Sequence, residues 1–386
     1  MIAPATTTAA PSRRTSRIVA LDIARGIAIL GTLGTNIWIF SHPAGFLGYL
    51  SEPTSPVEGW QPRAQRFLMA LANGKFLGLL TLMFGIGLAI QQQSAVRRGR
   101  RWPGSYPWRT ALLFLDGVLH YFLVVEFDVL MGYAVTGLIV AWIIAGTPAA
   151  QRRWIMITAG VHVVIILALT ALLIGSGPAQ RYNGPNPYAD GSWFDLVRLR
   201  WQFLGLFRLE PVLILLMGIA LFTLGARLLS AGLFEGRGAP LRQRLIMVGA
   251  GALALDLILA MTAPDTVLIS RYVLAPIVAL GLLSAIAAFW LDRSPGVIGR
   301  RLGEVGRIAL TCYILQNLLA AILFQGWGFG LSQAPKQWRT AITVSAYAGL
   351  CAVMVTAAHL WLRRFRRGPV EWAWARGYAL LAREPG

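Results

Sequence analysis

Long apolar runs separated by short polar segments dominate the chain. A membrane-spanning helix needs about 20 apolar residues to cross a hydrocarbon core of roughly 30 Å. We therefore predict an all-α, polytopic membrane protein with a single transmembrane domain over residues 17–367. The domain is expected to hold about ten helices, at residues 18–40, 67–92, 108–126, 129–147, 153–174, 207–229, 244–263, 270–291, 307–326 and 340–362.

The two ends of the chain differ from these runs. Residues 1–16 are rich in Thr, Ala, Pro and Arg, a composition that predicts a disordered cytoplasmic N-terminus. The first run is too long for the apolar region of a signal peptide, carries Asp22 and Arg25, and has no small-residue cleavage site. Residues 368–386 form a predicted cytoplasmic C-terminal tail.

Composition and charge placement agree with a membrane protein. Only 13% of the 386 residues are charged, about half the roughly 25% of a soluble domain. The net charge of +19 is compatible with nucleic-acid binding, but the arginines lie between the apolar runs. The positive-inside rule places most of them in the cytoplasm when both termini are cytoplasmic. We therefore predict a multi-pass protein of the inner (plasma) membrane, in contact with membrane lipids and without a nucleic-acid partner.

Cysteine and histidine patterns give no sign of a metal site. Cys312 and Cys351 both lie in apolar runs, so they form no disulfide framework. The four histidines include no pair at helical i,i+3 or i,i+4 spacing, and we predict no metal.

Ionisable residues inside the apolar runs are the first candidates for a site, because each is costly in lipid and needs a partner, a cavity or a function. Asp22 and Arg25 are three residues apart on the first helix and can pair. Such a pair either locks helix packing or lines a cavity open to the cytoplasm. Asn36 lies near the outer end of the same helix.

The third run carries the candidate base. Asp116 and His120 are four residues apart on one helix face, and Asp128 follows at the outer end. A carboxylate beside an imidazole orients the ring and raises its basicity, as a general base requires. A buried neutral histidine bonded to a neighbouring helix is the structural alternative. His42 is a second candidate histidine, on the outer side.

Further polar residues sit in the later runs. Glu210 starts the sixth, where it favours either a ligand or the helix dipole. Asp256 has no local partner and is expected to pair across helices. Gln316 and Asn317 lie mid-span in the ninth and can both donate and accept. Arg307 and the arginine clusters of the cytoplasmic face can hold phosphates or anionic lipid headgroups.

Several motifs together resemble the YeiB-like family of bacterial membrane proteins, which carries a domain of unknown function. The motifs are Leu21-Asp22-x-x-Arg25-Gly26 with Asn36, Phe84-Gly85-Ile86-Gly87, Gly117-x-x-His120 with Asp128 and Tyr133, Glu210 with Met217-Gly218, Gly306-Arg307 to Gln316, and Gly368 to Trp374. Phe127, Cys312 and Asn317 stand where the family usually has Gly, Asn and Ser.

The first-helix motif is also similar to that of membrane acyltransferases, such as the lysosomal enzyme that acetylates heparan glucosamine. This resemblance implies acyl transfer from a cytoplasmic acyl-CoA or acetyl-CoA to a sugar, lipid or other small-molecule acceptor. His120, oriented by Asp116 or Asp128, would be the base. Asn36, Gln316 or Asn317 would stabilise the oxyanion, and Arg25 and Arg307 would hold donor phosphates or structural carboxylates.

A second hypothesis comes from another functional class. Membrane-buried Asp22/Arg25 and Asp116/His120 suit a proton-coupled transporter or exporter of a small or lipid-like solute equally well. A non-catalytic membrane partner is a third alternative. The sequence leaves the oligomeric state open, with a homodimer among the alternatives.

Overall fold

The computed structural model describes residues 18–51, 59–176 and 183–382, and these described segments contain helices and no strands. The predicted disordered stretch 1–16 lies outside the described residues. The prediction of an all-α fold is confirmed. The principal helices are α1 (Val19–Phe40), α3 (Trp60–Ala72), α4 (Lys75–Arg97), α5 (Tyr106–Leu123), α6 (Leu130–Ala145), α7 (Pro148–Gly175), α12 (Leu215–Ser230), α13 (Ala239–Thr262), α15 (Ala275–Trp290), α16 (Gly296–Arg307), α17 (Ala309–Phe324), α18 (Lys336–Arg364) and α19 (Pro369–Leu381).

Shorter helices connect them. They are α2 (Gly45–Leu50), α8 (Pro187–Asp190), α9 (Trp193–Gln202), α10 (Leu204–Phe207), α11 (Leu209–Leu213), α14 (Val267–Ile269) and the 3-10 segments Gly236–Gly238, Pro264–Thr266 and Leu331–Gln333. A π-helical turn, Ser270–Leu274, precedes α15.

The described residues contain seven helical stretches long and apolar enough to cross a membrane, or eight if α16 and α17 are joined across their 87° bend. Every predicted run is largely helical, but run 67–92 is divided between α3 and α4, and run 207–229 is divided among α10, α11 and α12. However, α5 carries Arg109, Asp116 and His120, and α6 has only 16 residues. Seven or eight of the described helical stretches could therefore span a membrane, as expected for a membrane protein, and the predicted total of ten is not confirmed.

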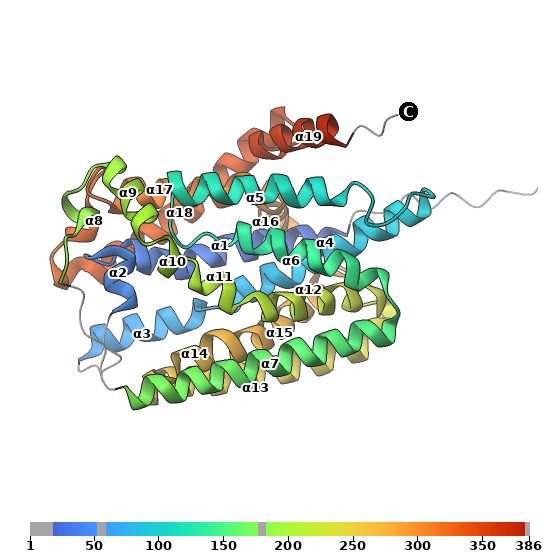
Figure 1. The fold of residues 1–386 in the computed structure, drawn as a ribbon, viewed down its shortest axis with the longest axis horizontal. Coiled ribbons are helices and arrows are strands. Elements are labelled where there is room, and N and C mark those ends of the chain that lie inside the picture. Colours follow the sequence, from blue (N-terminus) through green and yellow to red (C-terminus); the bar gives the residue numbers. More distant parts are fainter. Residues whose placement is uncertain (1–17, 52–58, 177–182, 383–386) are drawn as a thin grey trace, which may run out of the picture.

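The helices run along the long axis of the molecule, and their connections gather at its two ends (Figure 1). The α4–α5 and α6–α7 connections lie at one end, shown on the right. The short helices α2, α8 and α9 lie at the other. These two groups are the segments that the charge pattern assigned to the cytoplasm and to the outside, respectively.

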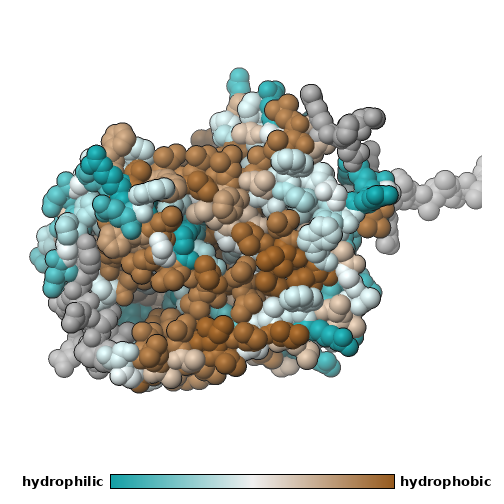
Figure 2. Space-filling view, in the orientation of Figure 1, coloured by the Kyte–Doolittle hydropathy of each residue, from teal (hydrophilic) through white to brown (hydrophobic). Residues whose placement is uncertain are grey.

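Peripheral helices contribute one narrow stripe to the core and leave the rest exposed. On α7 the buried residues are spaced by four: Thr158, His162, Ile166 and Thr170. Figure 2 shows a broad hydrophobic band across the middle of one face, with hydrophilic residues at both ends. A surface of this kind is suited to lipid.

Close contact of α1 with α16 sets the position of α17. A Cβ on Gly306 would lie 1.8 Å from the Asp22 carbonyl oxygen, and one on Gly26 would lie 2.0 Å from the Leu302 oxygen. Only glycine allows this backbone approach. The chain then bends by 87° into α17, which runs beside α1.

The C-terminal segment closes this bend. Glu371, in α19, accepts hydrogen bonds from the backbone N–H groups of Leu310 (2.9 Å) and Thr311 (3.1 Å). These N–H groups belong to the first turn of α17, where the backbone donors have no acceptor within the helix. The predicted tail is therefore docked, through a carboxylate that caps α17.

Candidate functional site

His120 and Asp128 meet where α5 gives way to α6. The helix α5 ends at Leu123, and the segment between it and α6 turns Asp128 back toward His120. Asp128 Oδ1 lies 3.0 Å from His120 Nδ1, while Oδ2 accepts from the backbone N–H groups of Leu130 (2.9 Å) and Met131 (3.3 Å). One carboxylate thus caps α6 and orients the imidazole. His120 is 2% exposed and Asp128 is fully buried.

Two asparagines continue the network on the other side of the ring. Asn317 Nδ2, in α17, lies 3.3 Å from His120 Nε2, and Asn36 Nδ2, in α1, donates to Asn317 Oδ1 over 3.2 Å. We call the four residues Asn36, Asn317, His120 and Asp128 the imidazole chain. The Tyr313 ring packs on the imidazole with centroids 5.1 Å apart.

The contacts of the imidazole chain define one consistent arrangement of protons. A carboxylate oxygen accepts from a ring N–H, an arrangement in which Nδ1 carries the hydrogen. Asn317 Nδ2 is a donor, so Nε2 presents its lone pair. In this arrangement Nδ1 faces a carboxylate, and Nε2 faces an amide that a substrate hydroxyl or amine could replace.

Asp116 takes a different place from the one that helix spacing suggested. Within the described part of the chain no hydrogen bond joins it to His120, and its Oδ2 is buried without a hydrogen-bond partner. Of the two carboxylates considered for orienting His120, the structure pairs Asp128 with it.

The remaining predicted site residues are dispersed. Asp22 and Arg25 pair over 3.5 Å near the start of α1. Arg307 is exposed at the end of α16. Gln316 Nε2 donates to Thr32 Oγ1 over 3.3 Å, and its Oε1 is buried without a partner. None of these residues is joined to the imidazole chain by a hydrogen bond among the described residues.

Glu210 belongs to a separate, partly buried cluster. Its Oε1 accepts from Arg271 Nη2 (2.7 Å) and from the Tyr272 hydroxyl (2.8 Å), and Arg271 Nη1 donates to Asn73 Oδ1 (2.6 Å). Arg271 and Tyr272 lie in the π-helical turn, a distortion often found at functional positions.

Next to this cluster, Lys75 forms a buried ion pair with Asp256 across α4 and α13. The side chains are 4% and 2% exposed. The expectation that Asp256 pairs across helices is confirmed. Lys75 also donates to the Ala70 carbonyl, whereas Asp256 Oδ1 is buried without a partner.

The other histidines have local explanations. His162 Nε2 bonds the Tyr272 carbonyl at 3.1 Å, a helix-to-helix contact. His42 Nδ1 accepts from the Ala44 N–H at 3.2 Å. Burial, aided by the Arg339 charge, lowers the pKa of His42 to about 4, so His42 is neutral at neutral pH.

The sequence patterns missed two arginines at the site. Arg200 lies in α9 and Arg208 lies just before α11, so both are far from His120 along the chain. They nevertheless bond the backbone of Asp128 and of the residues that precede it. The charge pattern counted both as outer-segment charges. The available signal was that such arginines sit among apolar and aromatic residues, where an unpaired charge is costly.

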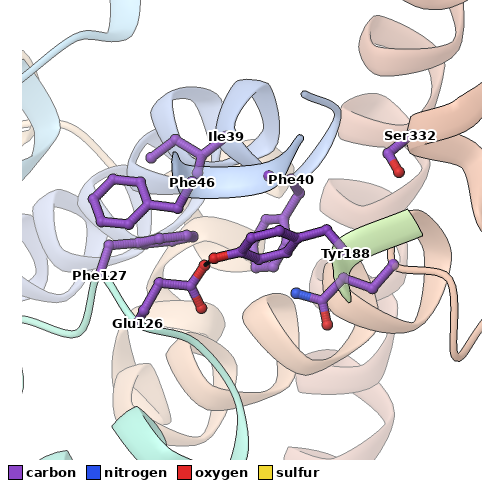
Figure 3. Close-up of a pocket in the computed structure, with 9 residues that line it drawn as sticks. Ile39, Phe40, Phe46, Glu126, Phe127, Tyr188 and Ser332 are labelled. Atoms are coloured by element: carbon purple, nitrogen blue, oxygen red, sulfur yellow. Dashed lines mark hydrogen bonds between the residues drawn. The ribbon is translucent and has the colours of Figure 1, made fainter. Parts of the chain in front are cut away.

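A small cavity lies near this segment, at the end of the molecule that carries α8. It measures about 10 Å³, roughly the space for the centre of one water molecule, and is lined by aromatic residues and by Glu126. Figure 3 shows the Tyr188 hydroxyl donating to the Glu126 carboxylate, with Phe40, Phe46 and Phe127 around them.

No group of His, Cys, Asp and Glu among the described residues has the geometry to hold a metal ion. Near His120, the described side chains offer three kinds of group. They are one oriented imidazole, the amides of Asn36 and Asn317, and a carboxylate.

Comparison with known proteins places these residues in a wider context. Residues 228–380 match a family model described as a protein of unknown function, DUF418. The chain is 28% identical to "Uncharacterized protein YeiB" of Escherichia coli (strain K12), over 93% of this chain and 95% of that one. It is 25% identical to "Uncharacterized protein YxaH" of Bacillus subtilis (strain 168), over 94% of both chains.

Proposed function

The chain belongs to the YeiB-like DUF418 family, and we propose that it is a transmembrane acyltransferase with His120 as its general base. The observation that carries this proposal is the imidazole chain. Asp128 fixes the proton on Nδ1, so the lone pair of Nε2 is available inside a buried site.

The proposed reaction moves an acyl group from the thioester of a cytoplasmic acyl-CoA to an acceptor hydroxyl or amine. The acceptor replaces the Asn317 amide at Nε2 and loses its proton to the imidazole as it attacks the thioester carbon. The C–S bond then breaks, and the imidazolium returns the proton to the leaving thiolate. The amide N–H released from Nε2 is available to donate to the oxyanion.

Charged groups at the other end of α17 suit the donor. Arg307 is exposed beside the bend before α17, and Arg25 lies on the neighbouring α1, where it also donates to the Gly306 carbonyl at 3.5 Å. We propose that these guanidinium groups hold donor phosphates at the cytoplasmic face of the inner membrane. The acceptor is proposed to be a sugar, a lipid or another small molecule.

The test is acyl transfer by purified protein in nanodiscs of native lipid, with acetyl-CoA labelled in its acetyl group. Loss of an oriented general base lowers the rate by roughly 10²- to 10⁴-fold, which is the effect expected for His120→Ala. The matched control is His162→Ala, a second buried histidine outside the imidazole chain. A His120→Ala protein that transfers label at the wild-type rate would remove the proposed base.

One observation favours a second candidate, proton-coupled transport. Lys75 and Asp256 form an ion pair that is almost fully buried beside the break between α3 and α4, and one carboxylate oxygen has no partner. Buried pairs of this kind occur in proton relays. In proteoliposomes with an imposed pH gradient, proton flux that depends on Asp256 and is indifferent to His120 would favour this candidate.

A further inference from the structure

The backbone that carries Asp128 is buried but belongs to no helix. It leaves α5 after Leu123 and enters α6 at Leu130, and Val125, Glu126 and Asp128 are each at most 1% exposed. Carbonyl groups in such a segment lack the regular backbone hydrogen bonds of a helix, and each buried carbonyl left without a partner costs free energy. Their bonds must come from side chains elsewhere.

Two arginines supply these bonds in a regular pattern. Arg200 donates from Nη1 to the Phe122 carbonyl and from Nη2 to the Val124 carbonyl, both over 2.9 Å. Arg208 donates from Nη2 to the Glu126 carbonyl and from Nη1 to the Asp128 carbonyl, the latter over 3.3 Å. The two planar guanidinium groups thus bond four alternate carbonyls. We call Arg200 and Arg208 the arginine clamp.

The charges of the arginine clamp are compensated within the same region. Glu126 Oε2 accepts from Arg200 Nε at 3.2 Å, and Glu126 Oε1 accepts from the Tyr188 hydroxyl at 2.6 Å. The Arg208 guanidinium lies 4.0 Å above the ring of Tyr121. Arg200 is 1% exposed, and burying its charge costs desolvation free energy that these bonds must offset.

We propose that the arginine clamp positions the base: by fixing residues 122–128, Arg200 and Arg208 hold the Asp128 carboxylate against His120 Nδ1 and thereby set the tautomer of the imidazole. They are positioning residues, since they bond the backbone and not the ring. A lysine cannot replace either one fully, because a point charge lacks the two-pronged geometry that bonds two carbonyls at once.

The significance of the tautomer for catalysis rests on the proposed function, but the tautomer itself does not. The test is therefore ¹⁵N NMR of histidine-labelled protein in nanodiscs, without any acyl donor. Signals of the four histidines are assigned by single substitutions. Asp128→Asn provides the reference for a ring that has lost its carboxylate.

We expect wild-type His120 to be protonated on Nδ1. Arg208→Gln should move population toward the Nε2–H form, in the direction of Asp128→Asn, and Arg208→Lys should give an intermediate shift. Arg198→Gln is the matched control, because Arg198 lies on α9 beside Arg200 but is 77% exposed. Its spectrum should match the wild type.

Arg208→Lys carries the test if Arg208→Gln does not fold. A folded Arg208 variant whose His120 signal equals the wild type would overturn the proposal. The two proposals fail separately. If the variants show the tautomer shift but the wild-type protein transfers no acyl group, the proposed function is wrong and the arginine clamp stands. If the protein transfers acyl groups but the Arg208 variants keep the wild-type tautomer, the proposed role of the arginine clamp is wrong.

Discussion

The imidazole chain and the Lys75–Asp256 pair are both buried, yet they differ in what they leave unused. In the ion pair, opposite charges face each other across α4 and α13, and the atom without a partner is an oxygen of the paired carboxylate itself, Asp256 Oδ1. In the imidazole chain, a ring bonded to Asp128 and Asn317 offers a lone pair that only a weak amide donor occupies. Burial alone therefore does not identify a reactive group. A site of reaction is distinguished by a partner that a substrate can displace.

The largest stability effect is expected at the ion pair. Lys75→Met leaves a buried carboxylate without a counter-charge and should lower the free energy of unfolding by about 3–5 kcal/mol. The double variant Lys75→Met/Asp256→Leu should regain most of that loss, because an apolar pair avoids the desolvation cost. Chemical unfolding in detergent micelles measures both. A single variant as stable as the wild type would show that the pair is already neutral and contributes no charge–charge energy.

Asn317 comes next, since it bonds two other members of the imidazole chain, His120 and Asn36. Asn317→Ala leaves both His120 Nε2 and the Asn36 amide without their present partners, and it should cost about 1–3 kcal/mol of unfolding free energy. The same unfolding measurement applies. A cost as large as that of Lys75→Met would erase the distinction drawn between the two regions.

Asn36 should have a smaller effect. It is only partly buried and donates one neutral hydrogen bond, so Asn36→Ala is expected to cost about 0.5–1.5 kcal/mol. Chemical unfolding of Asn36→Ala and Asn317→Ala under the same conditions compares the two costs. A larger loss for Asn36→Ala than for Asn317→Ala would contradict this order.

The smallest effect is pH dependence from His42, outside both regions. Its pKa is lowered from 6.5 to about 4 in the folded protein by burial and by the Arg339 charge. The unfolded chain therefore binds a proton between these pH values while the folded protein does not, and stability falls as pH drops from about 6.5 to 4. His42→Gln should reduce this slope, as unfolding at several pH values would reveal. If His42→Gln leaves the slope of stability against pH unchanged, other groups cause the pH dependence.

Sequence patterns predict the helices better than the site, for physical reasons that particular residues illustrate. Length and hydropathy suffice for α7 or α13, which bury one stripe and face lipid with the rest. They do not locate the 87° bend at Ile308, because the bend depends on the close approach of Gly26 and Gly306 and on capping by Glu371.

At the site, helical spacing identified Asp116 as a neighbour of His120, but the actual partner lies eight residues away, past the end of the helix. Asp128 was among the candidates because it follows that run. Nothing in local periodicity connects Arg200 and Arg208 to the same segment, since their bonds span more than seventy residues.

One measurement tests the contrast most directly: the rate of label transfer from acetyl-CoA by His120→Ala set beside that of Lys75→Met/Asp256→Leu, in the same nanodiscs. The account predicts a loss of roughly 10²-fold or more for His120→Ala and a near wild-type rate for the double variant. The reverse result, in which transfer survives without His120 and disappears without the ion pair, would contradict it.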